Sequence, residues 1–171
     1  NQYALSVFKA DDQTSIQNDT TGHPKENAVV SLNFKHHISE LVSFNFERSV
    51  SAFTDDTHSP RIDIQTHTTG YNMLGLFTRR ANSIYRYATK GGIEFNLNEA
   101  NVGLKYEEVD DSYRTLGTVF QDNDFRSYSL TFSFPVRTKL FISGEVGLRD
   151  QGLEADAENK DKNFIGMLNA S

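Results

Sequence analysis

The feature that most constrains the fold of this chain is an alternation of apolar and polar side chains with a period of two residues. Residues 127–134, Ser-Tyr-Ser-Leu-Thr-Phe-Ser-Phe, are the clearest case: every second residue is apolar, and the residues between are small hydroxyl side chains. Successive side chains of an extended strand point to opposite faces. The pattern therefore predicts β-strands with one apolar and one polar face.

The same alternation recurs along the chain, and the connections between the segments fall into two length classes. About eight strands are expected, at 2–10, 28–35, 40–53, 83–97, 100–109, 127–134, 139–148 and 163–171. Tight turns are expected near 36–39, 97–99 and 135–138, and longer loops at 11–27, 54–82, 110–123 and 149–162. Within 54–82, the segments 61–68 and 71–78 are each either a short strand or part of an ordered loop. Gly91-Gly92 predicts a bulge or bend.

Alternating short and long connections are typical of an up-and-down barrel whose two rims face different compartments. The fold class favoured by the sequence is all-β, an antiparallel up-and-down transmembrane β-barrel. Residues 1–171 are interpreted as a single β-barrel domain or barrel segment. The alternative is a soluble antiparallel sandwich or jelly roll, in which the same apolar face is buried in a core.

The polar strand positions favour the barrel. They combine small side chains with charges of both signs, which suits a crowded polar lumen where charges pair across strands. Aromatic residues on the other face lie near strand ends, as the aromatic girdles of membrane proteins do. The small positions are Ser31, Asn33, Ser43, Asn45, Asn101, Gly103, Ser129, Thr131, Ser133 and Ser143; the charged ones include Glu47, Arg86, Glu94, Lys105, Glu107 and Glu145; the aromatics include Tyr85, Phe95, Tyr106, Phe125, Phe134 and Phe164.

Composition excludes several other classes. The net charge of −6 and the pI near 5.3 argue against nucleic acid, which requires a clustered basic face. The absence of cysteine excludes a disulfide framework and a thiolate metal site. No apolar run approaches the roughly 18 residues of a transmembrane helix. The first residues lack the features of a signal peptide, so any signal peptide has been removed or lies upstream.

A further pattern begins at Tyr106, between two of the predicted strands, and consists of Tyr106, Val109, Asp110, Tyr113, Thr115, Leu116, Gly117, Asn123 and Asp124. In these residues the chain resembles a family of outer-membrane β-barrel proteins from Bacteroidota. The resemblance continues at Leu140, Ser143, Gly144, Gly147, Leu148, Leu153, Ile165, Gly166 and Asn169, and it covers mainly residues 83–171. Asp111 stands where the family pattern has proline. The resemblance implies a barrel in the bacterial outer membrane, with this chain a segment of a larger barrel, and it supplies no catalytic residue.

The predicted loops contain residues that could bind a metal or act as catalysts, but their spacing gives little support for a site. His36, His37, His58 and His67, with Asp55, Asp56 and Asp63, are the residue types of a zinc site, but no regular ligand spacing supports one and solvated histidines are favoured. The acidic loop 150–161, with Asp150, Glu154, Asp156, Glu158 and Asp161, is a weak calcium candidate, or a solvated loop that contacts lipopolysaccharide through bridging cations. Ser39 lies near His37, but nothing orients that histidine as a base. No catalytic, cofactor-binding or metal residue is therefore predicted.

The sequence predicts an integral protein of the bacterial cell outer membrane that acts as a channel, transport component or assembly scaffold, without catalysis. Its expected partners are the lipid bilayer, lipopolysaccharide and other envelope proteins, and not nucleic acid. The alternative function is that of a soluble secreted module that binds glycan or protein through its loops. Because the alternation continues through the last residues to Ser171, the chain is expected to be incomplete as a working barrel.

Overall fold

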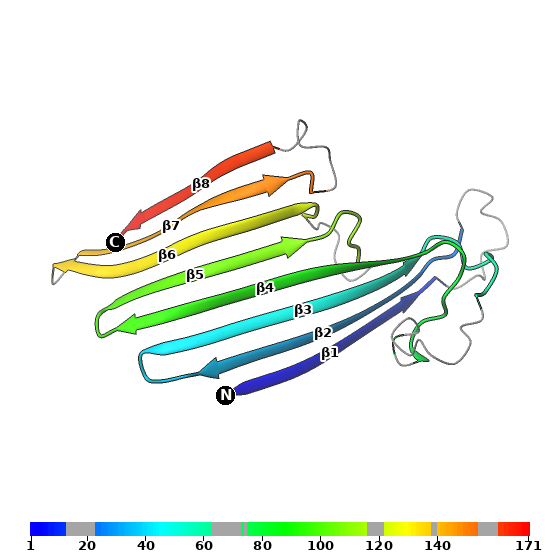
Figure 1. Ribbon diagram of the computed structural model, residues 1–171, viewed down its shortest axis with the longest axis horizontal. Helices are drawn as coiled ribbons and strands as arrows, with labels where there is room; N and C mark the ends of the chain where they lie inside the picture. Colours follow the sequence, from blue (N-terminus) through cyan, green and yellow to red (C-terminus); the bar gives the residue numbers. More distant parts are fainter. Residues whose placement is uncertain (13–22, 63–72, 74, 116–121, 138–139, 154–160) are drawn as a thin grey trace.

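The computed structural model contains eight β-strands in one antiparallel sheet (Figure 1). It describes residues 1–12, 23–62, 73, 75–115, 122–137, 140–153 and 161–171. The strands are β1 (Gln2–Asp11), β2 (Glu26–His37), β3 (Val42–Thr54), β4 (Ser83–Leu97), β5 (Ala100–Val109), β6 (Phe125–Arg137), β7 (Leu140–Gln151) and β8 (Asp161–Ala170). Each strand pairs with its neighbours in the chain, so the sheet order is β1 to β8 in sequence. The predicted all-β, up-and-down architecture is confirmed; the sheet is not closed, and β1 and β8 form its two edges.

The connections separate by length onto opposite ends of the strands, as predicted. The short turns β2–β3, β4–β5 and β6–β7 lie at one end, which we call the turn end, and the four long connections lie at the other, the loop end (Figure 1). The β4–β5 turn places Asn98 at φ 52°, a left-handed conformation that asparagine tolerates. In the β2–β3 turn, the Ser39 hydroxyl accepts hydrogen bonds from the backbone N–H groups of Leu41 (3.2 Å) and Val42 (3.1 Å).

Several strand limits differ from the prediction. β2 continues through His36 and His37, which were expected in the turn. β6 continues through Pro135, where the register shifts; a proline has no N–H to donate, so it fits a strand only at such an irregularity. At Gly91-Gly92 the register runs without a shift, so the expected bulge is absent. In the described parts of 61–68 and 71–78 there is no strand, only an isolated bridge between Arg61 and Arg80; 63–72 and 74 lie outside the described residues.

The strand register gives the sheet two chemically different faces, as the alternation predicts. Residues that pair directly across an antiparallel sheet lie on the same face. One such row, on what we call the apolar face, contains Phe44, Ile93, Leu104, Leu130 and Val146. The adjacent row on the other side, the polar face, contains Ser43, Glu94, Gly103, Thr131 and Glu145.

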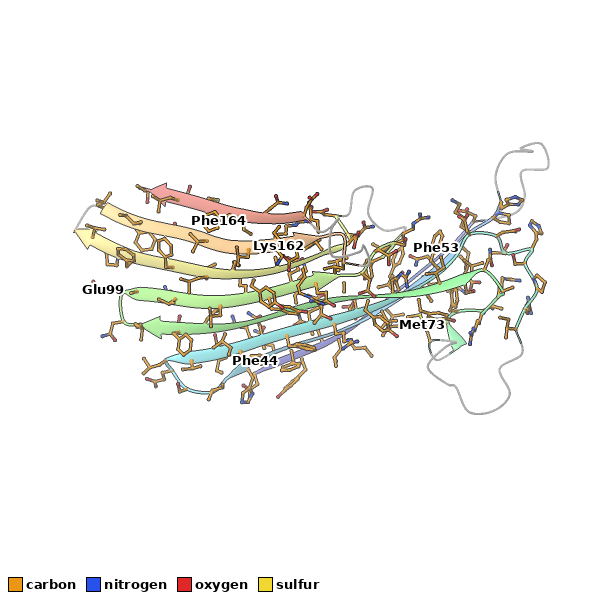
Figure 2. The ribbon with its side chains drawn as sticks, turned by 45° about the horizontal axis from the view of Figure 1, so that its top comes forward. Phe44, Phe53, Met73, Glu99, Lys162 and Phe164 are labelled. Carbon is orange, nitrogen blue, oxygen red and sulfur yellow. The ribbon has the colours of Figure 1, made fainter. Side chains whose placement is uncertain are left out.

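The described core is small and lies at the loop end. On the apolar face Met73 and Phe77, from the β3–β4 connection, pack on Ala28 and Ala52; we call this group the covered corner. Figure 2 shows Met73 at the loop end, opposite the turn that contains Glu99. On the polar face Val109, Tyr113 and Phe125 form a second buried cluster. Phe125 was predicted on the apolar face, which is wrong, because it lies two residues before Ser127 in β6 and pairs with Val109. Most of the apolar face has no cover from the described residues.

Candidate functional site

The polar face is a network of small and charged side chains joined across strands. The hydroxyls of Ser31 and Ser49 hydrogen-bond at 2.6 Å, and the Ser43 hydroxyl donates to Glu94 at 3.4 Å. Ion pairs join Lys90 to Glu107 at 2.9 Å and Lys105 to Glu145 at 3.2 Å. Opposite charges therefore meet between the neighbouring strands β4 and β5 and, across β6, between β5 and β7, as the composition of these positions suggested.

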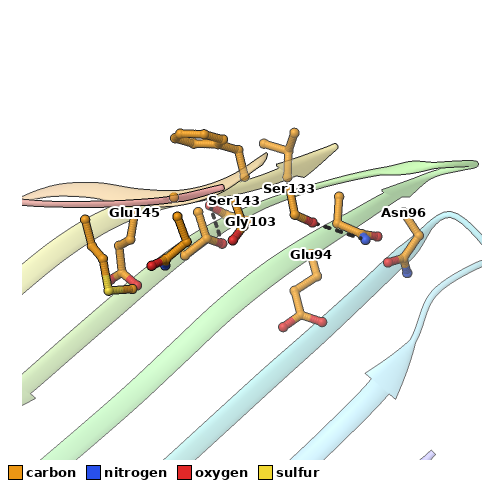
Figure 3. A pocket seen from close by; sticks show the side chains of 13 residues that line it. Glu94, Asn96, Gly103, Ser133, Ser143 and Glu145 are labelled. Atoms are coloured by element: carbon orange, nitrogen blue, oxygen red, sulfur yellow. Dashed lines mark hydrogen bonds between the residues drawn. The ribbon is translucent and has the colours of Figure 1, made fainter. Parts of the chain in front are cut away.

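Near the turn end, this face contains a hollow of about 480 Å³ that is lined by β4 to β8 (Figure 3). Two carboxylates, Glu94 and Glu145, lie among amide and hydroxyl side chains. The Asn101 amide donates to the Ser133 hydroxyl at 3.5 Å. Glycine at position 103 leaves room for the Thr131 side chain, because a Cβ atom there would lie 2.6 Å from the Thr131 hydroxyl oxygen. The hollow therefore offers hydroxyl and amide groups for hydrogen bonds and two negatively charged carboxylates.

At the loop end, the β5–β6 connection folds across the polar face. Tyr113 is buried, and burial raises the pKa of its hydroxyl, so the side chain stays neutral. The backbone carbonyl of Arg114 accepts hydrogen bonds from the Asn27 amide on β2 (3.5 Å) and from the Ser51 hydroxyl on β3. The Arg114 guanidinium lies 5.3 Å from the centre of the Phe53 ring. This connection thus reaches from β5 across β4 to β3 and β2, and covers part of the polar face.

A group of ligand-type side chains lies in the loops beside this end of the sheet. Asp56 contacts two histidines: its carboxylate lies 3.1 Å from Nδ1 of His58 and 3.7 Å from Nδ1 of His23. The candidate ligand atoms of the three residues all lie within 4.8 Å of one another. The backbone N–H of His58 also donates to the Asp56 carboxylate at 2.8 Å and is the main reason that the pKa of this carboxyl is lowered.

The structure brings together only part of the histidine and aspartate set that was considered from the sequence. His36 and His37 end β2 at the turn end, far along the sheet from His58 at the loop end. Asp55 pairs with Lys25 at 3.0 Å rather than with a histidine. His67 and Asp63 lie outside the described residues. Ser39 acts in its turn through the backbone hydrogen bonds given above, and no contact with His37 is seen among the described residues.

The acidic loop is described only at its ends. Asp150 pairs across the sheet with Lys162, and Asp161 pairs with Gln151, so the two aspartates point to opposite faces. Glu154, Asp156 and Glu158 lie outside the described residues, and the calcium hypothesis stays a prediction.

Sequence reasoning missed His23 and Arg114. Neither is part of a motif, and each meets its partners through the sheet order: His23 is in the β1–β2 connection, and its partners are in the β3–β4 connection. These residues could have been found from the predicted order of the hairpins, because that order places the long connections side by side at one end of the sheet.

Comparison with known proteins found no matching family model, curated protein or solved structure. Within the described residues, no helix is long and apolar enough to cross a membrane. The functional argument therefore depends on the sheet and its side chains.

Proposed function

We propose that this chain forms part of a transmembrane β-barrel in a bacterial outer membrane, of the Bacteroidota kind that residues 83–171 resemble. The apolar face contacts lipid and the polar face lines the lumen. The protein acts as a channel, transport component or assembly scaffold and not as an enzyme. The loop end faces the outside, where it meets lipopolysaccharide and other envelope proteins, and the turn end faces the periplasm, since long loops are typical of the outer side.

The observation that carries this proposal is a band of apolar side chains that crosses the strands obliquely. One hydrogen-bonded row runs across the sheet from Phe34 on β2 to Phe164 on β8. On β2 the band extends from this row toward the loop end, as far as Ala28. On β8 it extends toward the turn end, as far as Ala170. The apolar band thus shifts steadily along the strands from one side of the sheet to the other.

The size of this shift agrees with strands that are tilted in a membrane. The shift is about six residues of about 3.3 Å each, over about six strand spacings of about 4.8 Å, which corresponds to an angle of roughly 35°. Transmembrane barrel strands tilt by about 35–45° from the membrane normal. A flat lipid layer around tilted strands requires an oblique band of this kind, whereas the core of a soluble sandwich imposes no such boundary.

The limit of the band is marked by charge. On β5 to β8, the row directly beyond Tyr106, Tyr128, Leu148 and Phe164 contains Glu108, Arg126, Asp150 and Lys162. Arg126 forms an ion pair with Glu108 at 2.5 Å. In transmembrane barrels, aromatic residues followed by charged residues are typical of the place where the strands leave the hydrocarbon layer and enter the headgroup layer.

A barrel must provide partners for the two edge strands, because unpaired backbone groups in lipid cost several kcal/mol each. β1 and β8 are exposed along nearly their whole length and do not pair with each other. Either β1 pairs with β8 in the membrane, or further strands lie between them. We favour further strands, since the family that the chain resembles has larger barrels.

The alternative function is a soluble secreted sandwich module that binds glycan or protein through its loops. The covered corner favours it, because a sandwich requires protein cover over the apolar face. That cover, however, reaches only the loop end of β2 to β4 among the described residues.

The test is a charge placed at Leu104, which lies on the apolar face and is 54% exposed in this sheet. A soluble sandwich would bury Leu104 under protein, so Leu104→Arg would destabilise it in water, without any dependence on lipid. Against lipid the same change costs about 2–4 kcal/mol near the bilayer midplane. In the barrel that contains this chain, we expect Leu104→Arg to lower the fraction that folds into lipid vesicles, as measured by heat-modifiable gel migration. Asn101→Arg on the polar face of the same strand is the matched control and should fold normally. A folded, monomeric chain in detergent-free buffer that Leu104→Arg destabilises in the absence of lipid would support the sandwich instead.

A further inference from the structure

We propose that His23, Asp56 and His58 form a binding site for a zinc ion at the loop end. Two imidazoles and one carboxylate are typical zinc ligands. In a tetrahedral site with metal–ligand distances of about 2.0–2.1 Å, ligand atoms lie about 3.3 Å apart. Oδ1 of Asp56 lies 3.1 Å from Nδ1 of His58, and Oδ2 of Asp56 lies 3.7 Å from Nδ1 of His23. The candidate ligand atoms of the three residues all lie within 4.8 Å of one another, somewhat wider than in an occupied site. Small rotations of exposed side chains therefore bring the three ligands onto one ion.

The backbone already holds the two connections together at this point. The N–H of Thr57, between two of the ligands, donates to the carbonyl of Pro24, next to the third, at 2.8 Å. The Asp56 carbonyl accepts from the Asn82 amide at 3.3 Å and from the Ser59 N–H at 3.2 Å. Lys25 pairs with Asp55 beside the cluster. The backbone that bears the ligands is thus held by contacts that do not involve a metal, which lowers the ordering cost of binding one.

The side chains of the site are accessible to solvent, as is typical of a metal ion that exchanges with solution. The His23 and His58 side chains are 73% and 68% exposed, whereas Asp56 is 29% exposed between them. Three protein ligands leave the fourth position of a tetrahedral ion for water. A bound ion would join the β1–β2 connection to the β3–β4 connection, and the latter also supplies Met73 and Phe77 to the covered corner. This inference depends on loop geometry alone and holds whether or not the sheet spans a membrane.

The test uses the full chain, folded and stripped of metal, and Zn²⁺ itself in competition with a chromophoric chelator. We expect one Zn²⁺ per chain. His23→Gln, His58→Gln and Asp56→Asn should each weaken binding at least roughly tenfold, since even outer-shell changes commonly have that effect. Co²⁺ in place of Zn²⁺ should give a visible absorption band in the wild type that each of these variants loses.

Two control variants remove the same kind of side chain at positions outside the proposed site. His36→Gln and His37→Gln each remove a histidine at the turn end; both variants should bind Zn²⁺ as the wild type does. Ca²⁺ should not compete, because a site rich in imidazole does not suit a cation that prefers oxygen ligands. Absence of Zn²⁺ binding in the wild type, or binding unchanged in both His23→Gln and His58→Gln, would overturn the proposal. Because His23 contacts the cluster only through its side chain, its variant remains informative if a change at Asp56 disturbs the turn.

Discussion

The apolar face of the sheet consists of two regions that differ in side-chain size and in what covers them. In the covered corner, Ala28 and Ala52 are fully buried beneath Met73 and Phe77. Over the rest of the face the side chains are large and bare, as at Leu104 and at Phe164, which is 74% exposed. Small residues let another segment of protein approach the strands closely, whereas large residues extend apolar surface outward.

The same alternation of apolar and polar residues is therefore compatible with two kinds of packing. In the covered corner the apolar side chains form a protein core, so their contribution to stability comes from contacts within the chain. In the bare region the same strand face depends on its surroundings, which we propose to be lipid. Substitutions in the two regions should therefore respond differently to the solvent.

The largest expected effect is that of removing a ring from the covered corner. Phe77 is buried and packs edge-to-face on Tyr85, with ring centres 5.9 Å apart. Phe77→Ala should lower the free energy of unfolding by about 3 kcal/mol, because it leaves a cavity. Urea unfolding in two detergents of different chain length measures this, and the loss should be the same in both. Phe164→Ala in the bare region should cost less and should change with the detergent. If Phe77→Ala and Phe164→Ala lowered the free energy of unfolding equally, and with the same dependence on detergent, the two regions would not differ.

A smaller effect is expected from adding volume. Ala52→Leu should destabilise the chain by about 1–3 kcal/mol, since the space above Ala52 is filled. Ala170→Leu, on the exposed apolar face of β8, should stay within about 0.5 kcal/mol of the wild type. The same unfolding measurement compares the two variants. Tolerance of leucine at both positions would show that the cover is loosely packed.

The smallest effect concerns the turn that begins the covering connection. Asp56 has a pKa below its ordinary value of 3.8, chiefly because the His58 N–H donates to the ionised carboxylate. A lowered folded-state pKa means that the carboxylate stabilises this turn above about pH 3.8, and that the contribution is lost as pH falls through the lowered value. The NMR shift of the His58 amide proton, followed from pH 6 downward, should titrate with a midpoint below 3.8. In Asp56→Asn the transition should vanish; a wild-type midpoint at or above 3.8 would contradict the assigned hydrogen bond.

Much of the fold could be predicted because the evidence for it is local. The limits of β4 and β5 match the prediction, since the Asn98-Glu99 turn separates two long alternating segments. The limits of β2 and β6 do not, because pairing with neighbouring strands carries them through His37 and Pro135 into residues with turn chemistry. Of the candidate ligands, Asp56 and His58 were noted from the sequence. His23 was not, because its partners lie more than thirty residues away and meet it only through the order of the hairpins.

The sequence by itself determined which side chains share a face, because the period of two is a property of each extended strand alone. It also determined that the long connections lie at one end, because antiparallel neighbours reverse direction at every turn. Only the tertiary structure decided that the apolar band runs obliquely, since this depends on the register between strands. It likewise decided which corner is covered and which histidines meet, because these contacts join segments whose separation in the chain carries no local signal.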